Sequence, residues 1–320
     1  MQRRNFLRSA GAAVVTGTAT ASTAAANSDE TAETDSDMQI ILHGGAGGEP
    51  DDPEPRQAVM DEAADAGVAE DTPLDAVVSA LCVMEESPMF NAGVGGAIQS
   101  DGPVRTDAGL MMSDLEIGAV ASVPGVSEAT RAARVIMEET PHVLVRGEFA
   151  AEVAAGFGID TDVTLTTEDG LEDFEELDPP DGDAFDQLEW VNEVFGGTST
   201  VGGVARSGDQ LAAATSTGGL SYALAGRIGD VPQAGSGFYC TDAGGVSVTG
   251  TGEDIIRTTL SQRTVSLLED GETAQSAAEI ALDQFVDLTD STAGIIVQDA
   301  DGDTGITFNS DAMQTSESNS

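Results

Sequence analysis

Three hydroxyl side chains, those of Thr198, Ser199 and Thr200, lie in a row between two pairs of glycines in the octapeptide GGTSTVGG at residues 196–203. A hydroxyl is a weak nucleophile, so it reacts only where a nearby base takes its proton. A polar turn is the simplest structural interpretation, because glycine and small alcohols favour turns. A strand-like run follows directly, however, and a nucleophile at the start of a core strand is the functional alternative.

The residues that usually activate a hydroxyl or a thiol are scarce. The chain has two histidines, His43 and His142, and neither is close in sequence to a plausible nucleophile, so a Ser-His-Asp or Cys-His mechanism is poorly supported. The spacing of Cys82 and Cys240 fits no metal site, and buried free thiols are favoured over a disulfide. The glycine-rich residues 43–48 precede no helix start, so they do not fit a phosphate or dinucleotide loop.

A threonine that becomes N-terminal when the chain is cut needs no histidine, since its own α-amine can take the hydroxyl proton. An α-amine has a pKa of about 8, close to an ordinary operating pH. This scheme requires an exposed linker, a small-residue turn at the cut, and a core strand after it. The acidic stretch 158–199, the octapeptide and the strand-like residues 201–205 supply these parts.

The charge of the chain is strongly one-sided. It has 57 acidic and 12 basic residues and a formal net charge of −45, and every basic residue is arginine. Such a surface repels itself unless concentrated salt screens it, so the composition predicts a halophilic protein. It also repels phosphates and anionic lipids, so we expect neither nucleic acid nor a membrane as a partner.

The first residues have the pattern of an export signal. Arg3 and Arg4 open a twin-arginine pattern, a small apolar run follows at 10–15, and alanines at 24–26 offer a cleavage site. An Ala/Thr-rich disordered N-terminus, the alternative, leaves the paired arginines unexplained. We therefore expect a signal over residues 1–26, an acidic linker over 27–37, and an extracellular or cell-surface location. No later segment approaches the roughly 20 apolar residues that span a membrane.

Hydrophobic periodicity places helices between groups of hairpin-like strands, which favours an α+β fold over a doubly wound sheet. The acidic residues 158–195 are expected to be exposed or partly disordered. The remaining predicted elements are strands at 38–42, 104–112 and 116–123, helices at 55–69, 73–86, 127–139, 253–268 and 273–285, and hairpins at 201–205/211–216 and 294–298/304–309.

Six short motifs occur in the order found in plant-type L-asparaginases/isoaspartyl peptidases, which are N-terminal-nucleophile hydrolases. They are HGGAG (43–47), FNAGVG (90–95), TVG (200–202), AATSTGG (213–219), GRIGD (226–230) and TGTGE (249–253). Each is weak alone, but the chain resembles the family over residues 38–315. The resemblance implies an αββα four-layer sandwich with one catalytic domain over 38–320. It also implies a precursor cut into chains 38–199 and 200–320, which assemble as (αβ)2.

The resemblance assigns the catalytic roles as follows. Thr200 is the nucleophile, freed by cleavage after Ser199, and Thr217 is the second threonine that hydrogen-bonds it. Thr249 and Gly250 supply the oxyanion hole through a hydroxyl and a backbone N–H.

The resemblance also assigns substrate contacts. Arg227 and Asp230 hold an amino acid's α-carboxylate and α-ammonium, which agrees with the bidentate pairing of a guanidinium with a carboxylate. Thr249, Gly250 and Gly252 line the same site. Asn91 orients the nucleophile, although a turn asparagine is its structural alternative.

Family members need no cofactor, but a sodium ion is often held by backbone carbonyls of one loop. The corresponding residues are Met84, Glu85, Ser87, Phe90, Ala92 and Val94. The chain departs from the family pattern at Ser199, where Gly or Asp is usual, and in the unusually acidic linker.

The implied reaction is hydrolysis of the β-amide of L-asparagine, of isoaspartyl peptides, or of both, which releases L-aspartate with ammonia or an amino acid. A glycosylasparaginase is the nearest rival, but that group usually has Asp before the nucleophile and Asn-Gly-Asp where residues 251–253 read TGE. A threonine aspartase is a further rival within the fold. An uncleaved, exported amino-acid-binding protein is the alternative from another class.

Overall fold

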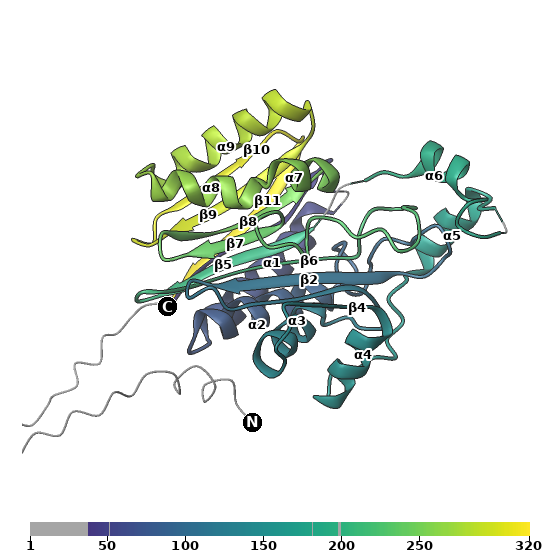
Figure 1. The fold of residues 1–320 in the computed structure, drawn as a ribbon, viewed down its shortest axis with the longest axis horizontal. Helices are drawn as coiled ribbons and strands as arrows, with labels where there is room; N and C mark the ends of the chain where they lie inside the picture. Colours follow the sequence, from purple (N-terminus) through teal and green to yellow (C-terminus); the bar gives the residue numbers. More distant parts are fainter. Residues whose placement is uncertain (1–37, 51, 181, 198–199) are drawn as a thin grey trace, which may run out of the picture. The chain divides into compact units, whose positions relative to one another are not determined.

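A computed structural model of the chain describes residues 38–320 except 51, 181, 198 and 199 (Figure 1). The expected export signal, the linker 27–37 and Ser199 therefore lie outside the described residues. The described part falls in a single compact unit.

The strand that begins within the octapeptide lies near the middle of a seven-stranded sheet. Its strands are β1 (Gln39–Gly47), β2 (Arg105–Met112), β3 (Ile117–Pro124), β4 (Leu144–Arg146), β5 (Val201–Ser207), β6 (Gln210–Thr217) and β11 (Ala312–Asn319). They lie in the order β11-β1-β5-β6-β2-β3-β4, and every neighbouring pair is antiparallel except β3 and β4. The HGGAG stretch is the end of β1 rather than a loop after a strand.

A smaller antiparallel sheet faces the first. Its strands are β7 (Phe238–Thr241), β8 (Gly244–Gly250), β9 (Ala293–Asp299) and β10 (Thr304–Phe308), in the order β10-β9-β8-β7. Buried apolar side chains from both sheets, among them Ile41, Val204, Phe238 and Ile296, form one cluster between them.

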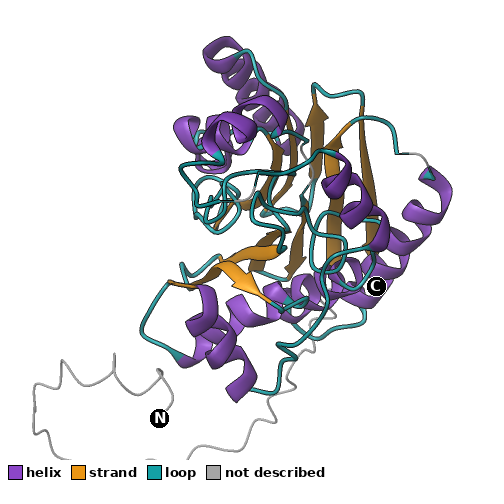
Figure 2. Ribbon diagram, turned by 90° about the vertical axis from the view of Figure 1, so that its right-hand side faces the viewer, coloured by secondary structure: helices purple, strands orange, loops and turns teal. Residues whose placement is uncertain are grey.

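Helices cover the two sheets. They are α1 (Pro53–Val68), α2 (Pro73–Glu85), α3 (Ala129–Glu139), α4 (Gly147–Gly156), α5 (Glu168–Glu176), α6 (Leu188–Val194), α7 (Gly252–Thr258), α8 (Leu260–Glu269) and α9 (Ala274–Thr289). The first three pack on the large sheet and α8 and α9 on the small one (Figures 1 and 2). In the part of the chain that is described, no helix has the length and apolar character needed to cross a membrane.

The predicted helices are confirmed, with one correction. Thr72 caps α2 by accepting a hydrogen bond from the Asp75 N–H at 3.1 Å, as a threonine before Pro73 should. The helix expected over 253–268 is instead two helices. Thr259 takes the left-handed conformation with φ 49°, which ends α7 and starts α8.

The acidic segment is more ordered than its composition indicates. Helices α5 and α6 form within 158–195, and their rings of Phe174 and Trp190 meet edge to face with centroids 6.0 Å apart. Both rings also lie against Tyr222, which follows the octapeptide hairpin. These few aromatic side chains fix the segment while its many carboxylates remain at the surface.

Candidate active site

Thr200 lies directly before β5, in a buried position with 6% of its surface exposed. In the β5–β6 hairpin Val201 is paired with Ser216, so Thr200 is the next residue toward Thr217 on the neighbouring strand. Thr217 is also buried and is paired on its other side with Asp107 of β2. The hairpin register thus brings together the two threonines that the resemblance paired.

Thr249 lies on β8 of the other sheet, and β8 packs across β5. A Cβ added to Gly202 would lie against the Ser247 hydroxyl, and one added to Gly245 would lie 2.6 Å from Val204. These two contacts show that β5 and β8 run in opposite directions across the layer. Two residues further along the same progression, Thr200 comes opposite Thr249.

The last residue of β8 has a backbone geometry that only glycine tolerates well. Gly250 has φ 140°, and an added Cβ would overlap the Thr292 carbonyl oxygen. The buried Thr249 hydroxyl accepts a hydrogen bond from the Ala46 N–H at 3.3 Å. Its own hydrogen is therefore oriented away from Ala46, as an oxyanion donor requires.

Asn91 holds the turn that follows Thr217. Its side chain accepts a hydrogen bond from the Ala97 N–H at 2.8 Å and donates one to the Gly219 carbonyl at 2.6 Å. The Gly219 N–H donates in turn to the Thr217 hydroxyl at 3.0 Å. Asn91 thus connects the FNAGVG motif to the second threonine.

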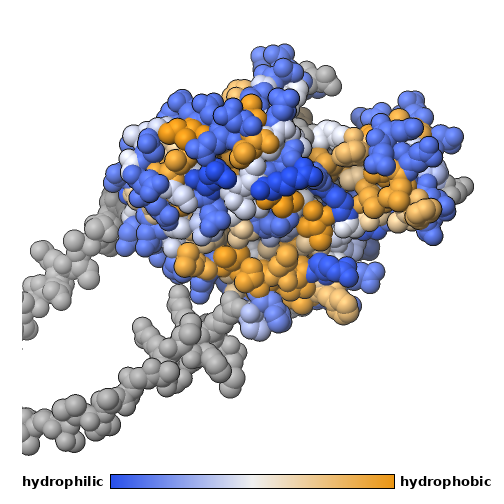
Figure 3. Space-filling view, turned by 45° about the horizontal axis from the view of Figure 1, so that its top comes forward, coloured by the Kyte–Doolittle hydropathy of each residue, from blue (hydrophilic) through white to orange (hydrophobic). Residues whose placement is uncertain are grey.

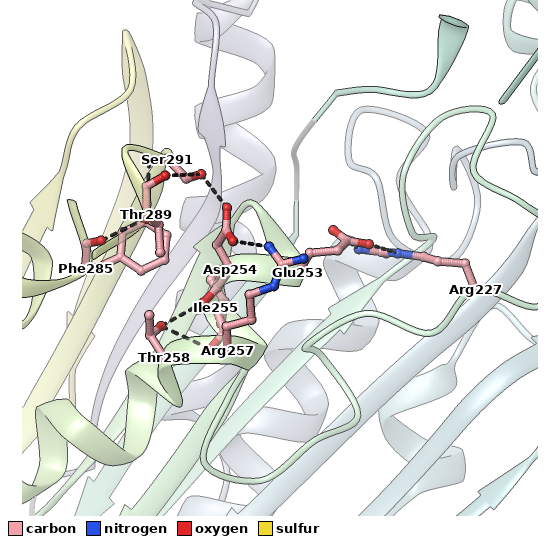
Figure 4. Close-up of polar contacts among 9 residues, drawn as sticks. All are labelled: Arg227, Glu253, Asp254, Ile255, Arg257, Thr258, Phe285, Thr289 and Ser291. Carbon is pink, nitrogen blue, oxygen red and sulfur yellow. Dashed lines mark hydrogen bonds and ion pairs between the residues drawn. The ribbon is translucent and has the colours of Figure 1, made fainter. Parts of the chain in front are cut away.

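Arg227 is engaged by a carboxylate of the chain itself. Its Nε and Nη2 donate to the two carboxylate oxygens of Glu253 at 2.8 and 2.9 Å, in a bidentate pair shown in Figure 4. The guanidinium is mostly buried, with 16% of the side chain exposed, while Glu253 lies at the rim with 40%. The Arg227 guanidinium is therefore oriented to bind a carboxylate, and here it binds that of Glu253 in the TGTGE motif.

Asp230 lies beside Arg227 and is buried, with 5% of its surface exposed. Its Oδ2 has no hydrogen-bond partner among the described residues. Burial raises the pKa of Asp230 to about 7, although the nearby Arg227 opposes this effect. A Cβ on Gly252 would lie 2.6 and 2.7 Å from Asp230 Oδ1 and Arg227 Nη2, so this glycine leaves the space beside them open.

Asp107 is a site residue that the sequence analysis missed. Its Oδ1 accepts a hydrogen bond at 2.6 Å from the N–H of Ser122, a residue with φ 52°, and its carboxylate also bonds the Gly229 backbone. Burial raises its pKa to about 6. An aspartate followed directly by the apolar residues of a strand was the available signal, because a buried carboxylate requires groups that satisfy it.

His43 lies close to a hydroxyl after all, but not to one that substrate can reach. Its Nε2 is 2.9 Å from the Ser247 hydroxyl, which is 2.8 Å from that of Thr215. All three side chains have 0% exposure, and burial lowers the pKa of His43 to about 3. The neutral imidazole links the two sheets beneath Thr200.

In the loop expected to hold sodium, three of the six carbonyls accept hydrogen bonds from backbone N–H groups of the same loop. The carbonyls of Met84, Glu85 and Ser87 accept hydrogen bonds from Ser87, Val94 and Phe90 at 3.2, 2.8 and 3.4 Å. A carbonyl oxygen that accepts one hydrogen bond retains a second lone pair, so these bonds do not test a sodium site, and sodium stays a prediction. Within the described residues, no group of three or more His, Cys, Asp or Glu side chains is placed to hold a metal. Cys82 and Cys240 are buried free thiols, as expected.

Two facing sheets with helices on their outer faces are consistent with the fold of the N-terminal-nucleophile hydrolases. A family model described as asparaginase matches residues 36–320. A plant-type L-asparaginase of Thermococcus kodakarensis is 37% identical over 289 residues, which cover 86% of this chain and 94% of the relative. An isoaspartyl peptidase/L-asparaginase of Danio rerio is 34% identical over 281 residues, with coverages of 85% and 89%.

The chain belongs to the plant-type L-asparaginase/isoaspartyl peptidase family and is a hydrolase of that kind.

Proposed function

We propose that the protein is an autoprocessed threonine amidohydrolase that cleaves the β-amide of L-asparagine and of isoaspartyl peptides. The observation that carries this proposal is the position of Thr200, which precedes β5, lies next to Thr217 in the hairpin and comes opposite Thr249 across the layer. No histidine or metal is needed in this arrangement, because the nucleophile brings its own base.

The proposed reaction starts with cleavage of the Ser199–Thr200 bond, which turns Thr200 into an N-terminus. Its α-amine takes the hydroxyl proton as Oγ attacks the β-carbonyl carbon of the substrate. The oxyanion is stabilised by the Thr249 hydroxyl and the Gly250 N–H, where each donor contributes about 3–4 kcal/mol. The leaving nitrogen receives the proton, and water then hydrolyses the acyl-enzyme to aspartate, which restores Thr200.

Arg227 and Asp230 are proposed to bind the α-carboxylate and the α-ammonium of the aspartyl moiety. The unpartnered, buried Oδ2 of Asp230 supports this role, since a buried acceptor costs free energy until a donor satisfies it. Glu253 holds the guanidinium fork in place, and the substrate carboxylate takes the remaining Arg227 N–H groups.

The full architecture and assembly are part of the proposal. Helices on the outer faces of two facing sheets support the αββα four-layer sandwich. We further propose that two processed precursors assemble as (αβ)2. Exposed apolar side chains of β4 and α4, including Leu144 and Phe149, support a contact surface between the two copies there.

Export and salt adaptation are also proposed. The paired arginines Arg3 and Arg4 support the twin-arginine route and an extracellular or cell-surface location. The net charge of −45 supports a halophilic protein, and hydrophilic residues cover much of the face drawn in Figure 3.

Intact mass of the purified protein, measured beside a Thr200→Ala variant, tests the nucleophile. We expect two fragments that meet at the Ser199–Thr200 bond, no cleavage in Thr200→Ala, and ammonia release from asparagine by the cleaved protein alone. A Thr198→Ala variant is the matched control and should still be cut. A folded but uncut wild-type chain that binds amino acids would overturn the proposal in favour of a binding protein.

A further inference from the structure

A cavity of about 320 Å³ lies beside the catalytic residues assigned above, and Asn91 is part of its wall. Its lining residues include 45–48 at and just after the end of β1, the loop at 88–91, Arg56 and Gln314. Neither Arg227 nor Asp230 lines it. A volume of this size is at the small end for ligand sites and suits about one amino-acid residue.

The cavity adjoins the reacting threonines through two of its wall residues. The N–H of Ala46 donates to the Thr249 hydroxyl, and Asn91 binds the turn that contacts the Thr217 hydroxyl. The same residues therefore position the catalytic hydroxyls and form the cavity wall. If the substrate's α-carboxylate binds at Arg227, a leaving group on the far side of the substrate carbonyl would point toward this wall.

Arg56 carries a positive charge, and the described groups that contact it are uncharged. Its guanidinium lies 4.5 Å from the centroid of the Phe90 ring. It donates to the Met89 carbonyl at 3.3 Å, to the Gln314 side chain and to the Gly44 carbonyl, all of which are uncharged. Among the described residues no carboxylate forms an ion pair with it, although the chain has 57 acidic residues.

This arrangement leaves binding capacity for an anion. A guanidinium has five N–H groups, and the three neutral acceptors leave hydrogens on both terminal nitrogens. Arg56 is half-buried at the cavity and is fixed by the ring beneath it, so little side-chain entropy remains to be lost on binding. A carboxylate is the group that best matches such a fork.

The two substrate types differ in this group. Asparagine releases ammonia, which has no carboxylate, whereas an isoaspartyl dipeptide releases an amino acid whose α-carboxylate is two bonds from the leaving nitrogen. We propose that the cavity is the leaving-residue subsite and that Arg56 binds the α-carboxylate of the C-terminal residue of isoaspartyl dipeptides. This inference rests on the proposed amidohydrolase function and makes dipeptides with a free C-terminus the preferred substrates.

The test compares three substrates with the cleaved enzyme: β-aspartyl-alanine, its C-terminal amide, and L-asparagine. We expect wild-type kcat/KM for the free acid to exceed that for the amide at least tenfold. Arg56→Gln should bring this acid-to-amide ratio close to one, mainly through KM, and Arg56→Lys should restore part of it. Arg131→Gln removes an exposed arginine of α3 and is the matched control.

Equal wild-type rates for acid and amide would overturn the proposal without any variant, so a misfolded Arg56→Gln protein does not leave it undecided. An Arg56→Gln protein that loses the same factor with all three substrates would also overturn it, since the residue would then only support the structure. If cleaved wild-type enzyme hydrolysed none of the three, the proposed function itself would fail, which is a distinct result.

Discussion

At the scale of single residues, several carboxyl groups in and near the site are buried. Burial favours their protonated forms more than in a carboxyl group exposed to water. The pKa of Asp230 is raised to about 7 and that of Asp107 to about 6, in both cases chiefly by burial. Glu85, which accepts hydrogen bonds from Thr130 and Ser216, has its pKa raised to about 7 for the same reason. These groups cost stability when ionised, and at Asp230 that cost belongs to a ligand site.

Asp230→Asn should stabilise the fold and weaken substrate binding. An acid whose pKa is raised in the folded state binds more protons there than in the unfolded chain, so stability falls as pH rises from about 4 to about 7 and stays low above that. Asn does not ionise, so the variant should gain on the order of 4 kcal/mol at pH 8 and little at pH 4.

Denaturant unfolding at both pH values, in the uncleaved Thr200→Ala background, measures this difference. The KM for asparagine of the cleaved Asp230→Asn enzyme should rise at least tenfold. A variant that is no more stable at pH 8 than at pH 4, relative to its parent, would contradict the assigned titration.

Asp107→Asn should separate substrate binding from chemistry. The carboxylate accepts from the Ser122 and Gly229 backbones, and an amide can replace only one oxygen without presenting N–H to N–H. Because Gly229 lies between Arg227 and Asp230, we expect KM for asparagine to rise about tenfold, which corresponds to about 1.4 kcal/mol, with a smaller effect on kcat. Asp101→Asn, in the nearby ion pair with Arg105, is the control. A larger loss in kcat than in KM would place Asp107 in the chemical step.

At the scale of elements, the approach of the two sheets determines the geometry of the site. Small residues on β5 and β8 let the strands come close at Gly202 and Gly245, and the proposed pairing of Thr200 with Thr249 depends on this spacing. The buried link from His43 through Ser247 to Thr215 then ties β1, β8 and β6 together. A change in the spacing of these strands therefore moves the oxyanion donor relative to the nucleophile.

Gly202→Ala should disturb this spacing. Its Cβ would overlap the Ser247 hydroxyl and approach His43 Nε2, and overpacking of this kind costs about 1–3 kcal/mol. We expect the unfolding free energy to fall by this amount, which denaturant unfolding measures. Cleavage at Thr200 should also be slower, which intact mass measures over time. Gly156→Ala, at an open position of α4, should change neither. Normal cleavage in a destabilised Gly202→Ala protein would show that the layer spacing does not control the nucleophile.

The sequence was most informative where contacts are local. Thr200 and the proposed substrate-binding residues Arg227 and Asp230 fall in short motifs, from which their roles could be predicted. Asp107 and the pairing of Arg227 with Glu253 could not, because these contacts depend on strand register and on how distant loops meet. Strand β11 was missed because its residues are mostly polar, and α5 and α6 because a few aromatic anchors offset their acidic composition.

At the scale of the whole molecule, charge is the dominant property. The net charge of −45 destabilises the folded state through self-repulsion, and salt reduces this repulsion. We therefore expect the Tm of the Thr200→Ala protein to rise by several degrees between about 0.1 M and about 2 M NaCl, because the screening length shortens to about 3 Å or less. KCl should act equally. A Tm that does not change with salt would contradict the proposed adaptation, and a rise with sodium alone would point to the loop at residues 84–94.

The strand order determines how the two fragments of the proposed cleavage are held together. In the large sheet β1 lies between β11 and β5, so a strand of one product is held on both edges by strands of the other. The two fragments share one sheet through backbone hydrogen bonds, so they should remain associated after the peptide bond is cleaved. They should also behave as a split protein: residues 38–199 and 200–320, made as separate polypeptides, are expected to reassemble on refolding. Such complementation would supply a Thr200 amino terminus without any self-cleavage.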